Sequence, residues 1–149
     1  VDRANLLVAL LYAHGPERAH RELQEMAVDA VALGDVDLSI DVIETAAAIW
    51  AGLGDATRAA RLLGVADKQR ELSGIPRAAP DQKHIDRFLG PVRDLVPERE
   101  WDEACARGAG MTIAEAVVLA TQDRPAPATT GTVPAQGTRQ ASVDRASSR

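Results

Sequence analysis

Residues 36–74, VDLSIDVIETAAAIWAGLGDATRAARLLGVADKQRELSG, contain two apolar stripes separated by Gly54-Asp55. Within each stripe the apolar residues recur every three or four positions, as they do on one face of an α-helix. The stripes are Ile40, Ile43, Ala47 and Trp50, followed by Ala59, Leu62, Leu63 and Ala66. The stretch therefore predicts two amphipathic helices, and the second should turn Arg58, Arg61, Asp67 and Arg70 mostly toward water.

Glycine turns recur on both sides of this stretch. Gly15, Gly34, Gly54 and Gly74 lie 19, 20 and 20 residues apart, and glycine readily takes the left-handed conformation that ends a helix. Runs with the two-residue period of a strand are missing, so we expect an all-α domain. Helix pairs that recur about every 40 residues are typical of a right-handed α-solenoid of antiparallel pairs, similar to tetratricopeptide repeats, here with about six or seven helices.

The first segment differs from the others because Leu6–Leu11 is apolar on all sides. A helix of this kind is expected to be covered on more than one face. We therefore expect a preceding repeat to pack on it. This predicts that the chain is a fragment of a longer protein or the product of a decayed gene.

After Pro80 the pattern predicts three further helices. One should span residues 81–96 and break or bend at Gly90-Pro91, because proline lacks the amide donor of a helix interior. The next should run from Pro97 to about Arg107. The last should begin at Thr112, which has the capping-box spacing with Glu115.

Composition separates residues 1–123, the expected helical domain, from residues 124–149, a Pro/Ala/Thr/Ser/Arg segment expected to be a disordered tail or linker. The total charge is −5 and the last 26 residues contribute +3, which leaves −8 on residues 1–123. Such a domain is a poor partner for nucleic acid. No apolar run approaches the roughly 20 residues of a membrane span, and a lone Cys105 indicates a cytoplasmic protein.

Two sequence segments resemble the C-terminal helical region of large ATP-dependent transcriptional regulators of the LuxR and AfsR/SARP types. These segments are RAARLLGVADKQRELSGIP at residues 58–76 and WDEACARGAGMTIAEAV at residues 101–117. The likeness spans residues 36–122 and departs from the family pattern at Cys105, where tryptophan is usual, and at Ala109, where arginine is usual. It implies an upstream ATPase domain and a helix-turn-helix elsewhere in the parent protein, neither of which this chain contains.

The same resemblance implies a binding groove lined by the first helix of each pair. The residues expected to face it are Asn5, Ala9, Tyr12, Asp41, Glu44 and Ala48. Because two of these are carboxylates, the groove should prefer a cationic partner or ligand. The alternative is that these residues form an ordinary solvated surface.

The sequence lacks the residue patterns typical of catalytic and metal sites. His14, His20 and His84 lack metal-ligand spacing and are expected at the surface, and we expect no metal and no cofactor. Gly52-Leu53-Gly54 and Gly108-Ala109-Gly110 lack the context of a phosphate loop and are interpreted as helix ends. Cys105, Trp50 and Trp101 are expected to be buried hydrophobic side chains, and Gly64 to permit close helix packing.

These observations favour a non-catalytic module that senses a protein or small-molecule effector, as the C-terminal part of an ATP-dependent regulator. One alternative is a free-standing tetratricopeptide-like adaptor that binds a peptide in its groove. A second alternative is a small enzyme that uses Asp41 and Glu44 as acid and base, which would need a pocket where both converge with a third polar group.

Overall fold

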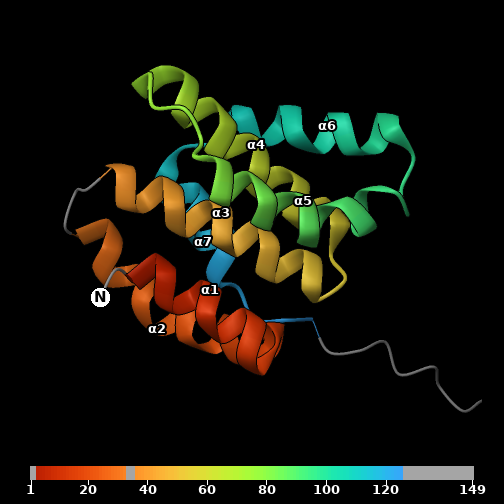
Figure 1. The fold of residues 1–149 in the computed structure, drawn as a ribbon. Helices are drawn as coiled ribbons and strands as arrows, with labels where there is room; N and C mark the ends of the chain where they lie inside the picture. The colour runs from red at the N-terminus through yellow and green to blue at the C-terminus, as the bar shows by residue number, and fades with distance from the viewer. Residues whose placement is uncertain (1–2, 33–35, 126–149) are drawn as a thin grey trace, which may run out of the picture.

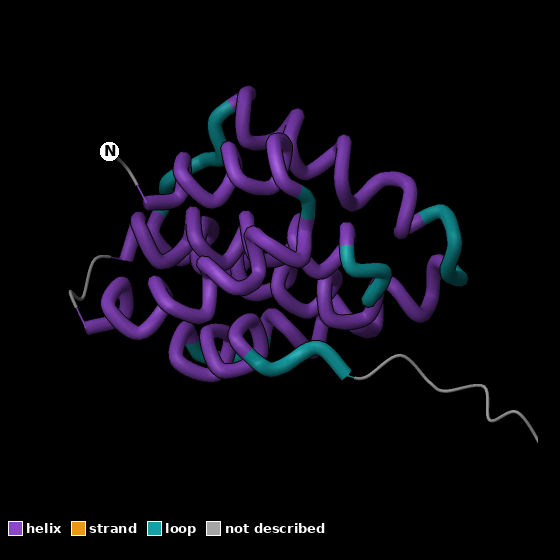
Figure 2. Tube along the Cα trace, turned by 90° about the horizontal axis from the view of Figure 1, so that it is seen from below, coloured by secondary structure: helices purple, strands orange, loops and turns teal. Residues whose placement is uncertain are grey.

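The structure is a computed structural model that describes residues 3–32 and 36–125. Within these ranges the chain forms seven α-helices and no strand, joined by short loops (Figures 1 and 2). The helices are α1 (Arg3–His14), α2 (Pro16–Ala32), α3 (Val36–Gly52), α4 (Ala56–Ser73), α5 (Ala79–Arg93), α6 (Glu98–Ala109) and α7 (Ile113–Thr121). The prediction of an all-α chain with about six or seven helices is confirmed.

Three of the four predicted glycine turns lie in the described residues, and all three have a left-handed backbone. Gly15 and Gly54 both have φ 86°, and Gly74 has φ 71°. After Gly54, the Asp55 carboxylate accepts a hydrogen bond from the Arg58 amide at 3.0 Å and caps α4. The fourth turn, at Gly34, lies outside the described residues, as does the predicted tail from residue 126 onward.

Helix α3 lies at the centre of the fold. It contacts α1, α2, α4, α5 and α7, and α1 and α5 pack on it as neighbours of the same layer (Figure 1). From Ser39 to Ala51 every residue except Asp41 is buried. The prediction of a single apolar stripe therefore underestimates the buried surface of α3, because five helices pack around it instead of one or two.

Helix α1 is covered on one face only by the described residues. Ala4, Leu7 and Leu11 are buried, whereas Leu6 is 39% exposed and Ala9 is exposed. The described residues thus leave part of this apolar helix uncovered, and the packing of a preceding repeat on it stays a prediction. Its outer apolar side faces solvent because α1 lies at the end of the layer and has α2 and α3 as its main contacts.

Helix α5 continues through Gly90-Pro91 and ends at Arg93, so the predicted break does not occur and the predicted range of 81–96 is displaced. Pro91 lies within the last turn of α5, so the bond that an amide there would have donated to the Arg87 carbonyl is lost only in the final turn. The turn is still closed by the Asp94 amide, which donates to the Gly90 carbonyl at 3.1 Å.

Helices α4 and α6 cross at very short range through two glycines. A Cβ atom at Gly64 would overlap the Cys105 carbonyl, and one at Gly108 would overlap the Arg61 carbonyl. The packing role predicted for Gly64 is confirmed. The interpretation of Gly108-Ala109-Gly110 as a helix end is confirmed, since α6 ends at Ala109, and Gly108 also serves the same close approach from the other side.

Helix α7 folds back onto elements much earlier in the chain. Its start at Thr112 has the predicted capping box with Glu115, and its body packs on α2, α3 and α4. The Trp50 indole N–H donates to the Ala120 carbonyl at 2.9 Å, and the Gln24 side-chain amide donates to the Thr121 carbonyl at 3.0 Å. Polar contacts with α2 and α3 thus hold the end of α7.

Candidate functional site

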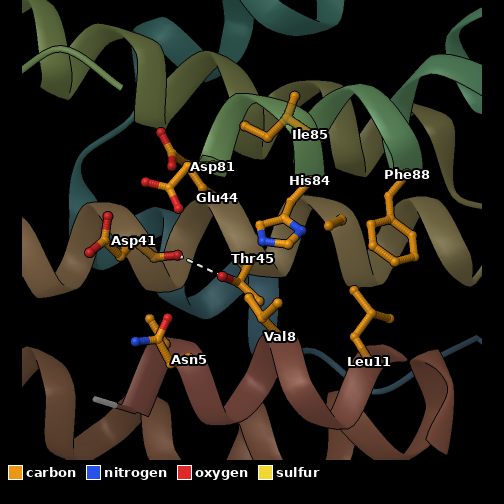
Figure 3. A pocket seen from close by; sticks show the side chains of 12 residues that line it. Asn5, Val8, Leu11, Asp41, Glu44, Thr45, Asp81, His84, Ile85 and Phe88 are labelled. Atoms are coloured by element: carbon orange, nitrogen blue, oxygen red, sulfur yellow. Dashed lines mark hydrogen bonds between the residues drawn. The ribbon is translucent and has the colours of Figure 1, made fainter. Parts of the chain in front are cut away.

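A pocket opens between α1, α3 and α5, the three helices that lie side by side (Figure 3). The space between their side chains, counted together with the open mouth, is about 510 Å³. Twelve residues line it. They are Ala4, Asn5, Val8 and Leu11 of α1, Asp41, Glu44, Thr45 and Ala48 of α3, and Asp81, His84, Ile85 and Phe88 of α5.

The structure brings together four of the six residues expected in the groove. Asn5, Asp41, Glu44 and Ala48 all line the pocket. Tyr12 does not line it but lies directly beside it. Ala9 is exposed on another side of α1 and takes no part.

One end of the pocket is acidic. Asp41, Glu44 and Asp81 gather on the same side in Figure 3, and Asn5 approaches them from α1. Glu44 is only 5% exposed and is held by two arginines. Its carboxylate oxygens accept hydrogen bonds from Arg70 Nε at 2.5 Å and Nη2 at 2.9 Å, and from Arg77 Nε at 2.9 Å.

These pairs correct two expectations about charged residues. Arg70 was expected to turn toward water, but its guanidinium reaches from α4 to Glu44 and to Asp41, at 3.0 Å from Asp41 Oδ1. Arg58 was also expected to face water, but its guanidinium lies 3.9 Å from the centre of the Trp50 ring. The cause in both cases is that α3 presents a buried acid and an aromatic ring to α4, so the arginines turn inward.

The acidic charge that remains toward the pocket belongs to Asp41 and Asp81. The Asp81 side chain makes no hydrogen bond or ion pair with any described residue. Burial raises the pKa of Asp41, the Arg70 guanidinium lowers it, and the charges of Glu44 and Asp81 raise it again. The net effect is a raised pKa for Asp41 despite its ion pair with Arg70.

The opposite end of the pocket is apolar. Val8 and Leu11 face Ile85 and Phe88 across it, and the His84 ring lies between this end and the carboxylates (Figure 3). Beside it the Tyr12 hydroxyl and His84 Nδ1 share a hydrogen bond of 2.6 Å, which links α1 to α5.

Tyr12 adds further contacts at the apolar end. Its ring meets the Phe88 ring edge-on, with the two centres 5.2 Å apart. On the Tyr12 ring lies the Arg87 guanidinium, 4.7 Å from its centre. These contacts hold Tyr12 beside the pocket, against two of the residues that line it.

The contribution of α5 was missed at the sequence level, although a signal was present. Asp81, His84, Ile85 and Phe88 have the i, i+3, i+4, i+7 spacing of one helical face. The face mixes an acid, a histidine and two apolar residues, so it does not resemble a core stripe. Its position opposite α1 depends on long-range packing against α3.

His20 departs from the surface position expected for the histidines. It is buried, and its ring meets the Trp50 ring edge-on with the centres 4.8 Å apart. Burial lowers the pKa of His20, chiefly through desolvation. Its Nε2 atom is buried without a hydrogen-bond partner, so the neutral ring is packed as an aromatic group.

The remaining candidate residues behave as packing groups. Trp50 and Trp101 are buried as expected, and Cys105 is partly buried between α6 and α4. Burial raises the pKa of Cys105 to about 11, so the residue is a thiol near neutral pH. Among the described residues no group of three or more His, Cys, Asp or Glu side chains is arranged to hold a metal ion.

Comparison of the chain with protein-family models, with curated proteins and with solved structures found no match. In the described ranges no helix combines the length and apolar character needed to cross a membrane.

Proposed function

We propose that the chain is a non-catalytic, cytoplasmic binding module in which the pocket between α1, α3 and α5 receives an effector. In this proposal the helices form a short right-handed stack of tetratricopeptide-like pairs, with α1, α3 and α5 as the first helices of successive pairs. The packing of α1 on α2 and of α3 on α4 supports the first two pairs, whereas α6 packs on α4 and α7 folds back on α2, α3 and α4.

The observation that carries the proposal is the convergence of three helices on one pocket. Asn5, Asp41, Glu44 and Ala48 come from two helices and meet there, and α5 completes the wall. An effector in the pocket would contact α1 and α5 at once, and both of these helices pack on α3. Binding would therefore favour one relative position of these helices, which is the requirement for transmitting a signal.

The resemblance of residues 36–122 to LuxR-type and AfsR/SARP-type regulators suggests what receives this signal. We propose an upstream ATPase domain as the partner of the module, with the effector biasing that domain between two states. The exposed apolar side of α1, which includes Leu6, is the surface we assign to the preceding segment. Direct contact with nucleic acid is no part of this proposal, because residues 1–123 are strongly acidic.

The enzyme alternative gains one feature from the structure, since Asp41 and Glu44 share the pocket with Asp81 and His84. However, Arg70 and Arg77 occupy both oxygens of Glu44. A carboxylate held by two guanidinium groups is a poor acceptor for a substrate proton. The arrangement therefore favours binding over acid–base chemistry.

Binding in the pocket can be tested with a blocked variant. Val8 lines the pocket whereas its neighbour Ala9 is exposed outside it, so Val8→Phe should fill the space and Ala9→Phe should leave it open. Backbone NMR spectra would be recorded with n-pentylammonium, 1-pentanol and n-pentanoate as probes. We expect at least one probe to shift signals of α1, α3 and α5 in the parent chain and in Ala9→Phe, but not in Val8→Phe. Absence of any such shift in the parent chain would overturn the binding proposal.

The regulator and adaptor alternatives differ in what α1 needs. Residues 1–149 would be compared, by light scattering and binding of a hydrophobic dye, with a version extended upstream in its gene. Dye binding or self-association that disappears on extension is expected for a module of a larger regulator. A compact monomer that binds no dye without extension would favour the free-standing adaptor.

A further inference from the structure

The two ends of the pocket differ in chemistry along one direction. Ala4 and Leu11 mark its limits on α1, and seven residues of helix correspond to about 10 Å. The acidic end lies beside Asn5, and the apolar end lies beside Leu11 and Phe88 (Figure 3). A ligand that fits must therefore be polar at one end and apolar at the other.

The charge at the acidic end is not balanced. Arg70 is shared between Asp41 and Glu44, and Arg77 is shared between Glu44 and Asp67. Two guanidinium groups thus serve three of the acids, and Asp81 adds a fourth carboxylate without a partner in the described part of the chain. The surplus of negative charge faces the pocket through Asp41 and Asp81.

We infer that the pocket binds an alkylammonium group, with the ammonium between Asp41 and Asp81 and the alkyl chain against Val8, Leu11 and Phe88. This inference rests on the proposed function and names the ligand chemistry of the same site. A lysine side chain of a partner protein and a small free amine both carry this chemistry. His84 and Thr45 lie between the two ends of the pocket, where the alkyl chain of the ligand would pass.

An ammonium fits this end better than the other charged groups. An anion would meet Asp41 and Asp81 with no free guanidinium to receive it, because Arg70 and Arg77 are already bonded to acids. A planar guanidinium is best bound by two oxygens of one carboxylate, and Glu44 already gives this geometry to Arg70. Asp41 and Asp81 come from different helices, which suits a compact charge with donors in several directions.

The length of the ligand is also limited. Tyr12 packs edge-on against Phe88 and is bonded to His84, so it lies directly beside the apolar end of the pocket. A five-carbon chain with its ammonium group is shorter than this span of about 10 Å and fits within it. Longer chains should gain little affinity because Tyr12 would have to move.

The test compares three probes of one length: n-pentylammonium, 1-pentanol and n-pentanoate. We expect n-pentylammonium to bind about fivefold or more tightly than 1-pentanol and n-pentanoate not to bind, as measured by NMR titration of α1, α3 and α5 signals. Asp81→Asn should weaken n-pentylammonium about threefold to fivefold, the effect of a partly exposed ion pair, and leave 1-pentanol unchanged. Asp86→Asn is the matched control, since Asp86 is an exposed acid of α5 that does not line this pocket.

The outcomes separate this inference from the proposed function. If 1-pentanol binds as tightly as n-pentylammonium, or if Asp86→Asn weakens the amine as much as Asp81→Asn does, the ammonium site is refuted while the pocket remains a binding site. If no probe shifts the pocket signals, both proposals fail. A capped Gly-Lys-Gly peptide distinguishes the sources: affinity equal to or above that of n-pentylammonium supports the site and assigns it to a partner's lysine. Weaker binding of the peptide supports the site and assigns it to a free amine.

Discussion

In helices α1 and α3, burial does not follow the apolar character of the sequence. Helix α1 has an unbroken apolar run at Leu6–Leu11, yet Leu6 is 39% exposed. Helix α3 contains Ser39, Glu44 and Thr45, yet all three are buried along with its apolar residues. The difference shows that the position of a helix in the layer decides how many of its sides are covered. Polar groups on a central helix can be buried because the fold supplies their partners.

The largest expected difference between the two helices concerns their apolar side chains. Trp50 of α3 is 1% exposed and bonded to the Ala120 carbonyl, so Trp50→Ala should lower the free energy of unfolding by about 3–5 kcal/mol. Leu6→Ala in α1 should change it by about 0.5 kcal/mol or less. Urea unfolding followed by circular dichroism would measure both. Equal losses would contradict the assignment of α3 as the central helix and α1 as a covering one.

A smaller effect is expected from the buried acid of α3. Glu44→Gln leaves Arg70 and Arg77 without their shared carboxylate and should cost about 2–4 kcal/mol, because both guanidinium groups are largely removed from water. The matched control is Glu103→Gln, which removes the exposed Arg99–Glu103 pair and should cost about 0.5 kcal/mol or less. Similar losses in the two variants, measured by the same unfolding experiment, would show that Glu44 is not held as described.

Protonation of His20 tests the contact between α2 and α3. Because burial lowers the pKa of His20 below that of the unfolded chain, the unfolded state binds the proton more readily. The contribution of the neutral ring is present above pH 6.5 and should be lost as the pH falls from 6.5 through the lower folded pKa. Arg58 strengthens this effect and Asp123 opposes it.

The change that isolates this effect is His20→Phe, which keeps a ring against Trp50 and cannot be protonated. The difference in unfolding free energy between the parent chain and His20→Phe should shift against the parent as the pH falls from 7.5 to 5.5. His14→Phe, at an exposed position of α1, should leave the parent's pH dependence in place. A loss of stability on acidification that is the same with and without His20 would exclude the ring as its source.

Local sequence signals predicted where helices begin and end better than which helices pack against one another. The left-handed glycines and the Thr112–Glu115 capping box depend on a few adjacent residues, and they were found where expected. The predicted break at Gly90-Pro91 does not occur, because Pro91 lies in the last turn of α5 and disturbs only that turn. What could not be predicted is which helix becomes central, since α7 reaches α3 only after the chain has folded back.

The pocket was predicted only in part, because some of its residues are close in sequence and others meet only through long-range packing. Asp41 and Glu44 are one turn apart on a single helix, so their common face follows from spacing. Arg70 and Arg77 lie 26 and 33 positions after Glu44 in the sequence. Their contact with Glu44 therefore depends on the packing of α4 on α3. That packing converts an expected open acidic groove into one in which Glu44 is neutralised and Asp81 carries the unpaired charge.

The smallest expected change in stability is at the exposed side of α1. Leu6→Gln removes an exposed apolar side chain without opening the core, so the free energy of unfolding should change by about 0.5 kcal/mol or less. Binding of a hydrophobic dye, and any self-association seen by light scattering, should nevertheless fall. The reason is that Leu6, together with Tyr12, is a large apolar side chain that α1 exposes to solvent. The control is Leu95→Gln in the α5–α6 loop, which is also exposed but lies away from α1. If Leu95→Gln lowers dye binding as much as Leu6→Gln, the apolar surface is general, and α1 loses its distinction as the face assigned to a preceding segment.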